Sequence, residues 1–124
     1  MSTNVEPTTR TGPRECGIAD ALGLVGDRWS LLVLREVNFG VRRFNDIRTN
    51  TGAPRETLSA RLRKLEECGL IARVRYSEHP PRDEYVLTEA GEALRPVLRS
   101  LREWGERYAR TDPRVSTSDR AVAE

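Results

Sequence analysis

The feature that most constrains the fold is a change of hydrophobic periodicity at Gly69. Before this glycine, Leu58, Leu62 and Leu65 recur at the spacing of one buried helical stripe. After it, apolar residues alternate with arginines from Leu70 to Tyr76, which is typical of a strand with one solvated face. Since glycine commonly ends a helix, the sequence predicts a helix that passes directly into a β-strand.

Turn and capping signals predict the elements around this junction. A helix is expected over residues 54–68, with a proline in its first turn. Residues 78–82 hold two prolines that cannot continue a ladder of hydrogen bonds, so they are predicted as a turn before a returning strand over residues 84–87. Thr88 is the predicted start of another helix, in which Pro96 either begins a new helix or kinks a continuous one.

The segment before residue 54 is predicted to hold three helices. The first lies within residues 16–25 and ends at a glycine, and Asp27 can cap the second, over residues 28–37, by accepting N–H bonds at its open start. Residues 41–43 are a candidate short strand, and a short amphipathic helix begins at Phe44. The resulting fold is α+β and mainly helical: a winged helix-turn-helix with an added helix at each end.

Positive charge is concentrated in the middle of the chain. Residues 42–82 hold ten basic and five acidic residues, a net charge of about +5, whereas the whole chain carries only +2. The excess of arginine over lysine is what a GC-rich genome produces, but codon usage does not explain the concentration. A basic stretch that coincides with the helix-turn-helix indicates a surface that faces a polyanion.

The helix over residues 54–68 has the size and polarity to enter the major groove of DNA. Arginine can hold a phosphate or make two bonds to guanine, and threonine can reach a phosphate or a thymine methyl group. For each arginine the alternative is a solvated surface or an ion pair with a nearby carboxylate. The candidate DNA contacts on this helix, before the preceding short helix and in the wing are Arg42, Arg43, Arg55, Thr57, Ser59, Arg61, Lys64 and Arg82.

The C-terminal helix carries a broad apolar stripe that favours a partner. Packing on its own domain is the alternative for part of the stripe. We expect the C-terminal helix to be a dimerisation helix of a two-fold homodimer, which would present two recognition helices to successive major grooves. The candidate interface residues on this helix are Leu98, Leu101, Trp104 and Tyr108.

From about residue 16 to residue 108, the sequence resembles the HxlR family of bacterial winged helix-turn-helix regulators, relatives of the MarR group. Short motifs in the family's order carry the resemblance, among them Gly26-Asp27-Arg28-Trp29-Ser30, Arg43-Phe44-Asn45-Asp46-Ile47, Thr57-Leu58-Ser59-Ala60-Arg61-Leu62, Pro80-Pro81-Arg82 and Leu87-Thr88-Glu89-Ala90-Gly91. The resemblance implies a homodimer that binds operator DNA, with dimerisation helices at both ends of the domain. The candidate interface residue in the N-terminal helix is Ile18. Ala60 departs from many relatives, which carry a longer polar side chain there, so a base contact from this position stays open.

Cys16 precedes the first helix, near the expected dimer interface. The resemblance implies a sensor role, because some relatives use a cysteine here to sense oxidants or electrophiles. Sensing requires an exposed thiolate, and the alternative is a small apolar residue that fills the interface. A small-molecule effector between the dimer helices, beside Trp29 or Trp104, is a further hypothesis. No metal or other cofactor is predicted.

These features predict a DNA-binding transcriptional regulator that binds an inverted-repeat operator as a homodimer. Repression, relieved by an oxidant or a small-molecule effector, is the expected mode, although the sign depends on where the operator lies. The alternative is a winged-helix protein-interaction module without specific DNA binding. An enzyme is not expected, because the sequence has one histidine, no phosphate-cradling glycine loop and no cluster with metal-ligand spacing.

The 124 residues are expected to form one domain over residues 14–110, between polar tails over residues 1–13 and 111–124. No apolar run approaches the roughly 20 residues that span a bilayer, and the N-terminus lacks the pattern of a signal peptide. We therefore expect no membrane partner and a cytoplasmic protein, in which Cys16 and Cys68 are reduced thiols.

Overall fold

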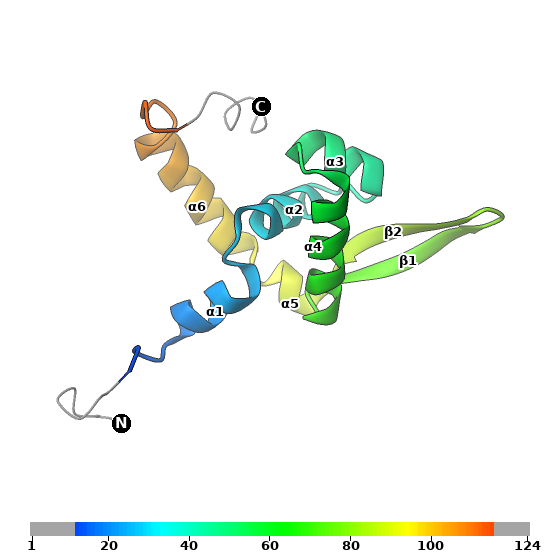
Figure 1. Cartoon of the computed structure of the whole chain (residues 1–124), viewed down its shortest axis with the longest axis horizontal. Helices are drawn as coiled ribbons and strands as arrows, with labels where there is room; N and C mark the ends of the chain where they lie inside the picture. The colour runs from blue at the N-terminus through cyan, green and yellow to red at the C-terminus, as the bar shows by residue number, and fades with distance from the viewer. Residues whose placement is uncertain (1–11, 116–124) are drawn as a thin grey trace.

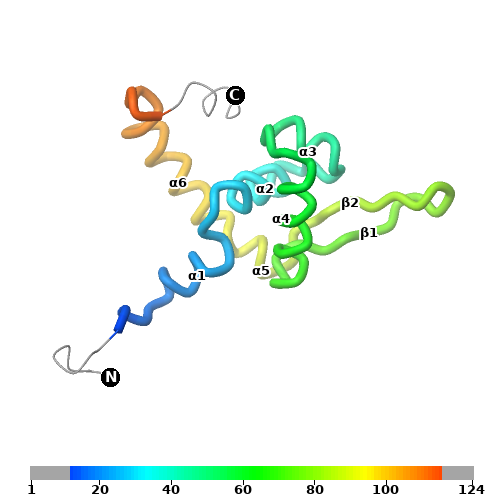
Figure 2. The backbone as a smooth tube through the Cα atoms, viewed as in Figure 1, coloured from blue at the N-terminus to red at the C-terminus, as the bar shows by residue number. Residues whose placement is uncertain are grey.

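In the computed structural model, which describes residues 12–115, the chain forms six helices and one two-stranded antiparallel sheet (Figure 1). The elements in chain order are α1 (Gly17–Val25), α2 (Arg28–Asn38), α3 (Phe44–Thr51), α4 (Arg55–Glu67), β1 (Ile71–Glu78), β2 (Pro81–Leu87), α5 (Glu89–Glu92) and α6 (Arg95–Tyr108). This architecture confirms the predicted winged helix-turn-helix. The wing, β1 and β2, projects from one side of the core, whereas α1 and α6 project from the opposite side (Figures 1 and 2).

Two helix starts carry the caps that the sequence predicts. The Asp27 carboxylate accepts a bond from the backbone N–H of Ser30, with Asp27 Oδ2 and Ser30 N 2.9 Å apart, which satisfies a donor at the open start of α2. Thr88 caps α5 in the same way, with its Oγ1 3.2 Å from the backbone N of Gly91. Pro96 lies in the first turn of α6, so it begins a new helix rather than kinking a continuous one.

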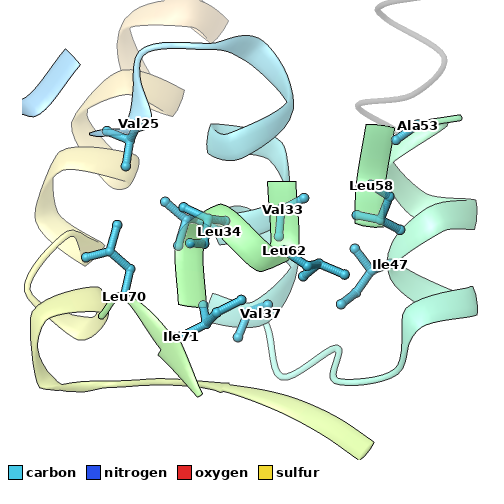
Figure 3. Packing of buried hydrophobic residues seen from close by; sticks show 11 residues of the cluster. Val25, Val33, Leu34, Val37, Ile47, Ala53, Leu58, Leu62, Leu70 and Ile71 are labelled. Carbon is cyan, nitrogen blue, oxygen red and sulfur yellow. The ribbon is translucent and has the colours of Figure 1, made fainter. Parts of the chain in front are cut away.

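The hydrophobic core lies between α2, α3, α4 and the start of β1 (Figure 3). The predicted stripe of α4 is confirmed, because Leu58, Leu62 and Leu65 are at most 2% exposed. They belong to one cluster with buried residues of the other elements, which include Val33, Leu34, Val37, Ile47, Leu70 and Ile71. Burying one such side chain stabilises the fold by roughly 1.5–3 kcal/mol, so this cluster fixes the orientation of α4.

The junction between α4 and β1 also has the predicted form. Gly69 has a φ of 78°, in the left-handed region that favours glycine, and the N–H of Leu70 bonds back to the carbonyl of Leu65 at 2.9 Å. The hydroxyl of Thr88 donates to the carbonyl of Gly69 at 2.5 Å. A side chain at Gly91 would collide with the Leu70 carbonyl, so α5 packs closely on this turn. The base of the wing is therefore fixed to the end of α4.

The wing is longer than the sequence predicts. β1 and β2 remain paired as far as Glu78 and Pro81, so the loop between them is only His79-Pro80, which is joined by a cis peptide bond. The turn predicted over residues 78–82 is too wide, and the strand start predicted at residue 84 is wrong. Pro81 is the first residue of its strand, a position where proline's missing N–H is tolerated.

The strand predicted over residues 41–43 is wrong. A single backbone bond joins this segment to the wing, in which the N–H of Tyr85 donates to the carbonyl of Arg42 at 2.8 Å. The N–H of Val41 bonds to the end of α2 instead, and the carbonyl of Arg43 accepts a bond from the first turns of α3, so no ladder can extend. The segment nevertheless holds the start of α3 against β2.

α1 and α6 are arms that bury little of their own surface within one chain. No residue of α6 is buried, although Leu94 and Leu98 at its start are half-buried against the core. Val25 is the one buried residue of α1. The fold therefore has a packed centre and two arms whose apolar side chains are largely exposed.

The ends of the described part bear on the predicted tails. Residues 111–115 form hydrogen-bonded turns after α6, in which the N–H of Val115 donates to the carbonyl of Asp112 at 3.0 Å. The other residues of the tails predicted over 1–13 and 111–124 lie outside the described residues, apart from exposed residues 12 and 13. The domain limits at residues 14 and 110 stay a prediction.

Candidate nucleic-acid interface

Burial of the leucine stripe turns the opposite side of α4 toward solvent. Arg55 is exposed at the first position of the helix, with its guanidinium carbon 5.4 Å from the centroid of the Phe44 ring. Thr57 and Ser59 are half-buried on the flanks of the stripe. The fully exposed side of α4 carries Glu56, Arg63 and Glu67. This side is long and polar enough to lie along a DNA groove.

The N-terminus of α4 is open. Pro54 precedes the helix and makes no capping bond with its side chain. The backbone N–H groups of the first turn therefore have no side-chain cap from Pro54, and they can donate hydrogen bonds to an anion such as a phosphate.

Four arginines of the helix-turn-helix and wing have exposed guanidinium groups that make no ion pair or hydrogen bond within residues 12–115. They come from the segment before α3, from α4 and from the tip of the wing. We call this set, which is Arg42, Arg55, Arg63 and Arg82, the unpaired arginines. Three of them are among the predicted DNA contacts, and all four keep their charge for a partner.

Two other predicted DNA contacts are turned to a carboxylate of the same chain. Arg61 Nε lies 2.8 Å from Asp27 Oδ2, and Lys64 Nζ lies 3.9 Å from Asp27 Oδ1. Asp27 is the residue that caps α2, so one carboxylate connects the start of α2 with the middle of α4. This arrangement fixes the rotation of α4 about its own axis.

The pKa of the Asp27 carboxyl shows how strongly its hydrogen bonds and ion pair stabilise the ionised form. Burial alone would raise this pKa, but hydrogen bonds from the hydroxyl and N–H of Ser30 and from Arg61, with the charge of Arg61, outweigh it. Together they lower the pKa from 3.8 to about 2. Asp27 is therefore ionised at any pH near neutrality.

Arg43 connects the start of α3 with the wing. Its Nε lies 3.3 Å from Glu84 Oε2, and its guanidinium carbon lies 4.4 Å from the centroid of the Tyr76 ring. Both partners belong to the wing strands, and the side chain of Arg43 remains more than half exposed. The contact positions the wing and leaves part of the guanidinium for a phosphate.

Along the wing, most of the positive charge is neutralised. Arg75 Nε lies 2.8 Å from Asp83 Oδ1 and its Nη1 lies 3.3 Å from Glu78 Oε1. Arg73 pairs with Glu66 at 3.2 Å and more loosely with Asp83. Arg82, near the tip, is therefore the wing arginine whose charge remains free. The alternative in which Arg82 pairs with a neighbouring carboxylate does not occur in the structure.

A buried carboxylate sets the angle between α2 and α3. Glu36 is 4% exposed and accepts a bond from Arg35 Nε at 2.6 Å and from the side-chain amide of Asn50 at 2.8 Å. Arg35 also donates to the carbonyl of Asn50 at 3.1 Å. These bonds join α2 to the end of α3, just before the turn that leads into α4.

The predicted dimer residues lie on the arms, away from the unpaired arginines. Ile18 on α1 is 74% exposed, and Leu101, Trp104 and Tyr108 on α6 are 50–59% exposed. The rings of Trp104 and Tyr108 have centroids 5.6 Å apart. Leu98 differs from the others, because it is half-buried against the core of its own chain.

The candidate sensor Cys16 is an exposed free thiol at the start of α1. Its Sγ accepts a bond from the backbone N–H of Ala19 at 3.4 Å. Cys68, the second free cysteine, ends α4 and packs partly against the core. Among residues 12–115 no group of three or more histidine, cysteine or acidic side chains is placed to hold a metal.

Sequence reasoning missed two residues of the interface. Arg63 was not among the predicted contacts, although its position opposite the leucine stripe was a sufficient signal. Asp27 was predicted only as a helix cap. Its bonds to α4 join residues 34 positions apart, and no periodicity in the sequence reveals such a pair.

A helix-turn-helix followed by a two-stranded wing, with exposed unpaired arginines on both, defines a winged helix-turn-helix protein. The model of the HxlR-like helix-turn-helix family matches residues 24–113, and the chain belongs to this family, as the resemblance predicted. Curated relatives are described as HTH-type transcriptional regulators, so the family is one of regulators and not of enzymes. None of the helices in residues 12–115 combines the length and the apolar character of a membrane span.

Three relatives illustrate the similarity. The uncharacterized HTH-type transcriptional regulator Rv3095 of Mycobacterium tuberculosis (strain H37Rv) is 55% identical over 91 residues, which are 73% of this chain and 58% of the relative. This chain thus spans less than two thirds of that relative. The crystal structure of PA1607 is 39% identical with a TM-score of 0.71, over 82% of this chain and 70% of PA1607. The redox regulator HypR in its oxidized form is 32% identical with a TM-score of 0.67, over 74% of this chain and 96% of HypR.

Proposed function

We propose that this protein is a transcriptional regulator that binds an inverted-repeat operator as a homodimer, with α4 in the major groove. The observation that carries the proposal is the distribution of charge over the interface. Arg43, Arg61, Arg73 and Arg75 are paired with carboxylates, whereas Arg42, Arg55, Arg63 and Arg82 face outward unpaired. The unpaired arginines lie on the helix-turn-helix and the wing, the two parts of this fold that meet DNA, and their charge would attract a polyanion.

The positions of these arginines fit the parts of a DNA site. We expect the open start of α4 and Arg55 to contact a backbone phosphate, and Arg63 and Thr57 to face the groove beside it. We expect Arg42 and Arg43 to contact the phosphates that flank the groove. Arg82 near the tip of the wing is expected to contact the adjacent minor groove or backbone. Ser59 lies on the flank of α4. Arg61 and Lys64 pair with Asp27, so the first role of these two residues is to hold α4 in position.

The exposed apolar residues of the arms support a homodimer. Trp104, Tyr108 and Leu101 on α6 and Ile18 on α1 are large apolar side chains that one chain leaves exposed. An interface between two copies would bury them and would place two α4 helices on one face of the dimer. A two-fold dimer of this kind reads two half-sites about one helical turn apart.

Footprinting on the DNA upstream of the gene and its neighbours tests the proposal. The expected result is protection of two inverted half-sites, with an affinity that falls steeply as salt is added, because phosphate contacts release counterions. Scrambled DNA of equal length is the control. Absence of protection, or an affinity indifferent to salt, would favour a winged-helix module that binds another protein. A promoter fusion with the operator in place then decides between repression and activation.

A redox signal at Cys16 is a second candidate for the control of this regulator. Its exposed thiol at the start of an arm is accessible to oxidants, and HypR, a structural relative, is a redox regulator. We expect oxidant to weaken operator binding by the wild-type protein and to leave Cys16→Ser unaffected. An equal response in the variant would remove Cys16 from this role, with Cys68→Ser as the matched control.

A further inference from the structure

A groove of about 520 Å³ lies between α2 and α6. Binding sites for small organic molecules have volumes of roughly 300–1,000 Å³ and mainly apolar walls. The apolar side chains of this groove come from both helices and are Leu31, Leu32, Phe39, Leu98 and Leu101. The groove therefore has the size and the lining of a ligand site.

The polar residues of the groove are predominantly cationic. None of its lining residues is acidic, and its basic residues are Arg35, Arg95, Arg99 and Arg102. Arg35 is neutralised by the buried Glu36, and Arg95 bonds the neutral side chain of Asn38 at 2.7 Å. Arg99 and Arg102 make no ion pair within residues 12–115. An apolar groove with uncompensated guanidinium groups attracts an occupant that brings a negative charge.

The groove adjoins the proposed dimer surface on α6 and shares Leu98 and Leu101 with it, but its arginines lie on another side of the helix. Arg95, Arg99 and Arg102 recur at a spacing of four and then three residues, which places them along one side of the helix. Trp104 and Tyr108 do not line the groove and are rotated away from the three arginines, although Leu101 belongs to both surfaces. Figure 1 shows α6 leaving the core at an angle to α2.

We propose that this groove binds an amphipathic organic anion, with an apolar body on the leucines and Phe39 and a carboxylate or sulfonate group on Arg99 and Arg102. Arg95, held by Asn38, closes one end of the site. Arginine suits this role because its planar fork matches a carboxylate or sulfonate oxygen pair and its charge is permanent. A neutral ligand would leave the guanidinium groups without a partner.

The position of the groove between α2 and α6 suggests that a bound ligand would regulate DNA binding, an inference that rests on the proposed function. α6 carries the proposed dimer surface, and α2 is fixed to α4 through Asp27 and to α3 through Glu36. A ligand between α2 and α6 would therefore contact both the helix that joins the two copies and the helix that holds the recognition helix. Its binding would alter the distance between the two α4 helices and hence the match to the half-sites.

Fluorescence titration of the full chain with 1-anilinonaphthalene-8-sulfonate tests the site, because this probe combines an apolar body with one sulfonate. N-phenyl-1-naphthylamine, which lacks only the sulfonate, is the neutral control probe. The test variant is the double substitution Arg99→Gln/Arg102→Gln. Arg107→Gln, which removes a charge elsewhere on the same helix, is the control variant, and Phe39→Ser removes an exposed apolar wall.

We expect the double variant to bind the anionic probe about tenfold more weakly, since a hydrogen bond to a charged group is worth at least that factor. The neutral probe should bind it unchanged, Arg107→Gln should match the wild type with both probes, and Phe39→Ser should weaken both probes. Undiminished binding of the anionic probe by the double variant would overturn the proposal. So would a changed monomer–dimer equilibrium in sedimentation with no effect on the probe, because a second copy would then occupy the groove. Neither result depends on the operator footprint, which tests the proposed function separately.

Discussion

The centre of the molecule and its arms use apolar residues in opposite ways. In the centre, Leu34 and Leu58 are 0% exposed, whereas Trp104 on α6 is 58% exposed although it belongs to an equally regular apolar stripe. The same helical periodicity thus produced a buried face in one region and an exposed face in the other. The difference indicates that the centre is stabilised within one chain, and it supports the proposed homodimer, in which a second copy would bury the arms.

This comparison separates two properties that substitutions can test independently. Changes in the centre should lower the stability of the single chain. Changes on the arms should lower association and leave the single chain nearly as stable, because their side chains have little to lose within it. Substitutions of the unpaired arginines should change neither property and act on DNA alone.

The largest effect is expected from Leu34→Ala in the centre. Leu34 is fully buried, and truncation of such a leucine costs about 3 kcal/mol through lost burial and the cavity that remains. Urea unfolding, followed by circular dichroism at low protein concentration, measures this loss. Leu101→Ala on α6 is the matched control and should cost less than about 1 kcal/mol under the same conditions. Equal losses at the two sites would contradict the division into centre and arms.

The sequence was sufficient for the centre of the fold because its signals are local. The leucine stripe of α4, the glycine after it and the caps at Asp27 and Thr88 each act over a few residues, and all of them are confirmed. The predicted strand over residues 41–43 failed for a non-local reason. Whether a short extended segment becomes a strand depends on the free N–H groups of a neighbour.

The sequence predicted which basic residues belong to the candidate site, but not which of them form ion pairs with carboxylates of the same chain. The sequence left open whether Arg61 faces DNA, faces solvent or pairs with a nearby carboxylate. Asp27, 34 positions earlier, turns it inward, and this depends on the packing of α2 against α4. The same limit applies to the wing, where cross-strand register decides which arginines meet Asp83.

The second effect tests the arms. Trp104→Ala should weaken association of two copies by about 2 kcal/mol, or roughly thirtyfold, since an exposed tryptophan on an apolar surface commonly becomes a central contact. Sedimentation equilibrium measures the dissociation constant. Urea unfolding of the monomer should be unchanged within about 0.5 kcal/mol. A monomer destabilised as strongly as by Leu34→Ala would show that α6 packs within its own chain.

The third effect tests the bond between α2 and α4 through pH. The pKa of Asp27 is lowered from 3.8 to about 2 in the folded chain, so its charge stabilises the fold above about pH 4. That contribution is lost as pH falls toward 2. Asp27→Asn keeps a good helix cap and removes only the charge. The variant should be less stable by about 1 kcal/mol at pH 6, a value reduced for the partial exposure of Asp27, and the difference should vanish near pH 2.

Urea unfolding of the wild type and of Asp27→Asn between pH 6 and pH 2 measures the difference in their stability. The titration of the other carboxylates is common to both proteins and cancels in this difference. Arg61→Gln should produce a pH dependence in the same direction but smaller, because the bonds from Ser30 to Asp27 remain. A stability difference between Asp27→Asn and the wild type that stays constant over the whole range would show that the charge of Asp27 does not contribute.

The smallest effect distinguishes two arginines within the centre itself. Arg63 is unpaired and exposed on α4, whereas Arg75 is held by Asp83 and Glu78 on the wing. Arg63→Gln should weaken operator binding by about 1 kcal/mol and reduce the slope of log affinity against log salt by about 1. Arg75→Gln removes a guanidinium that carboxylates of the wing already hold, so no phosphate contact is lost, the salt slope should stay near that of the wild type, and a small loss of stability is expected. Filter binding across a salt series, with unfolding measured in parallel, compares the two. Identical salt slopes would mean that pairing within the chain does not decide which arginines meet DNA.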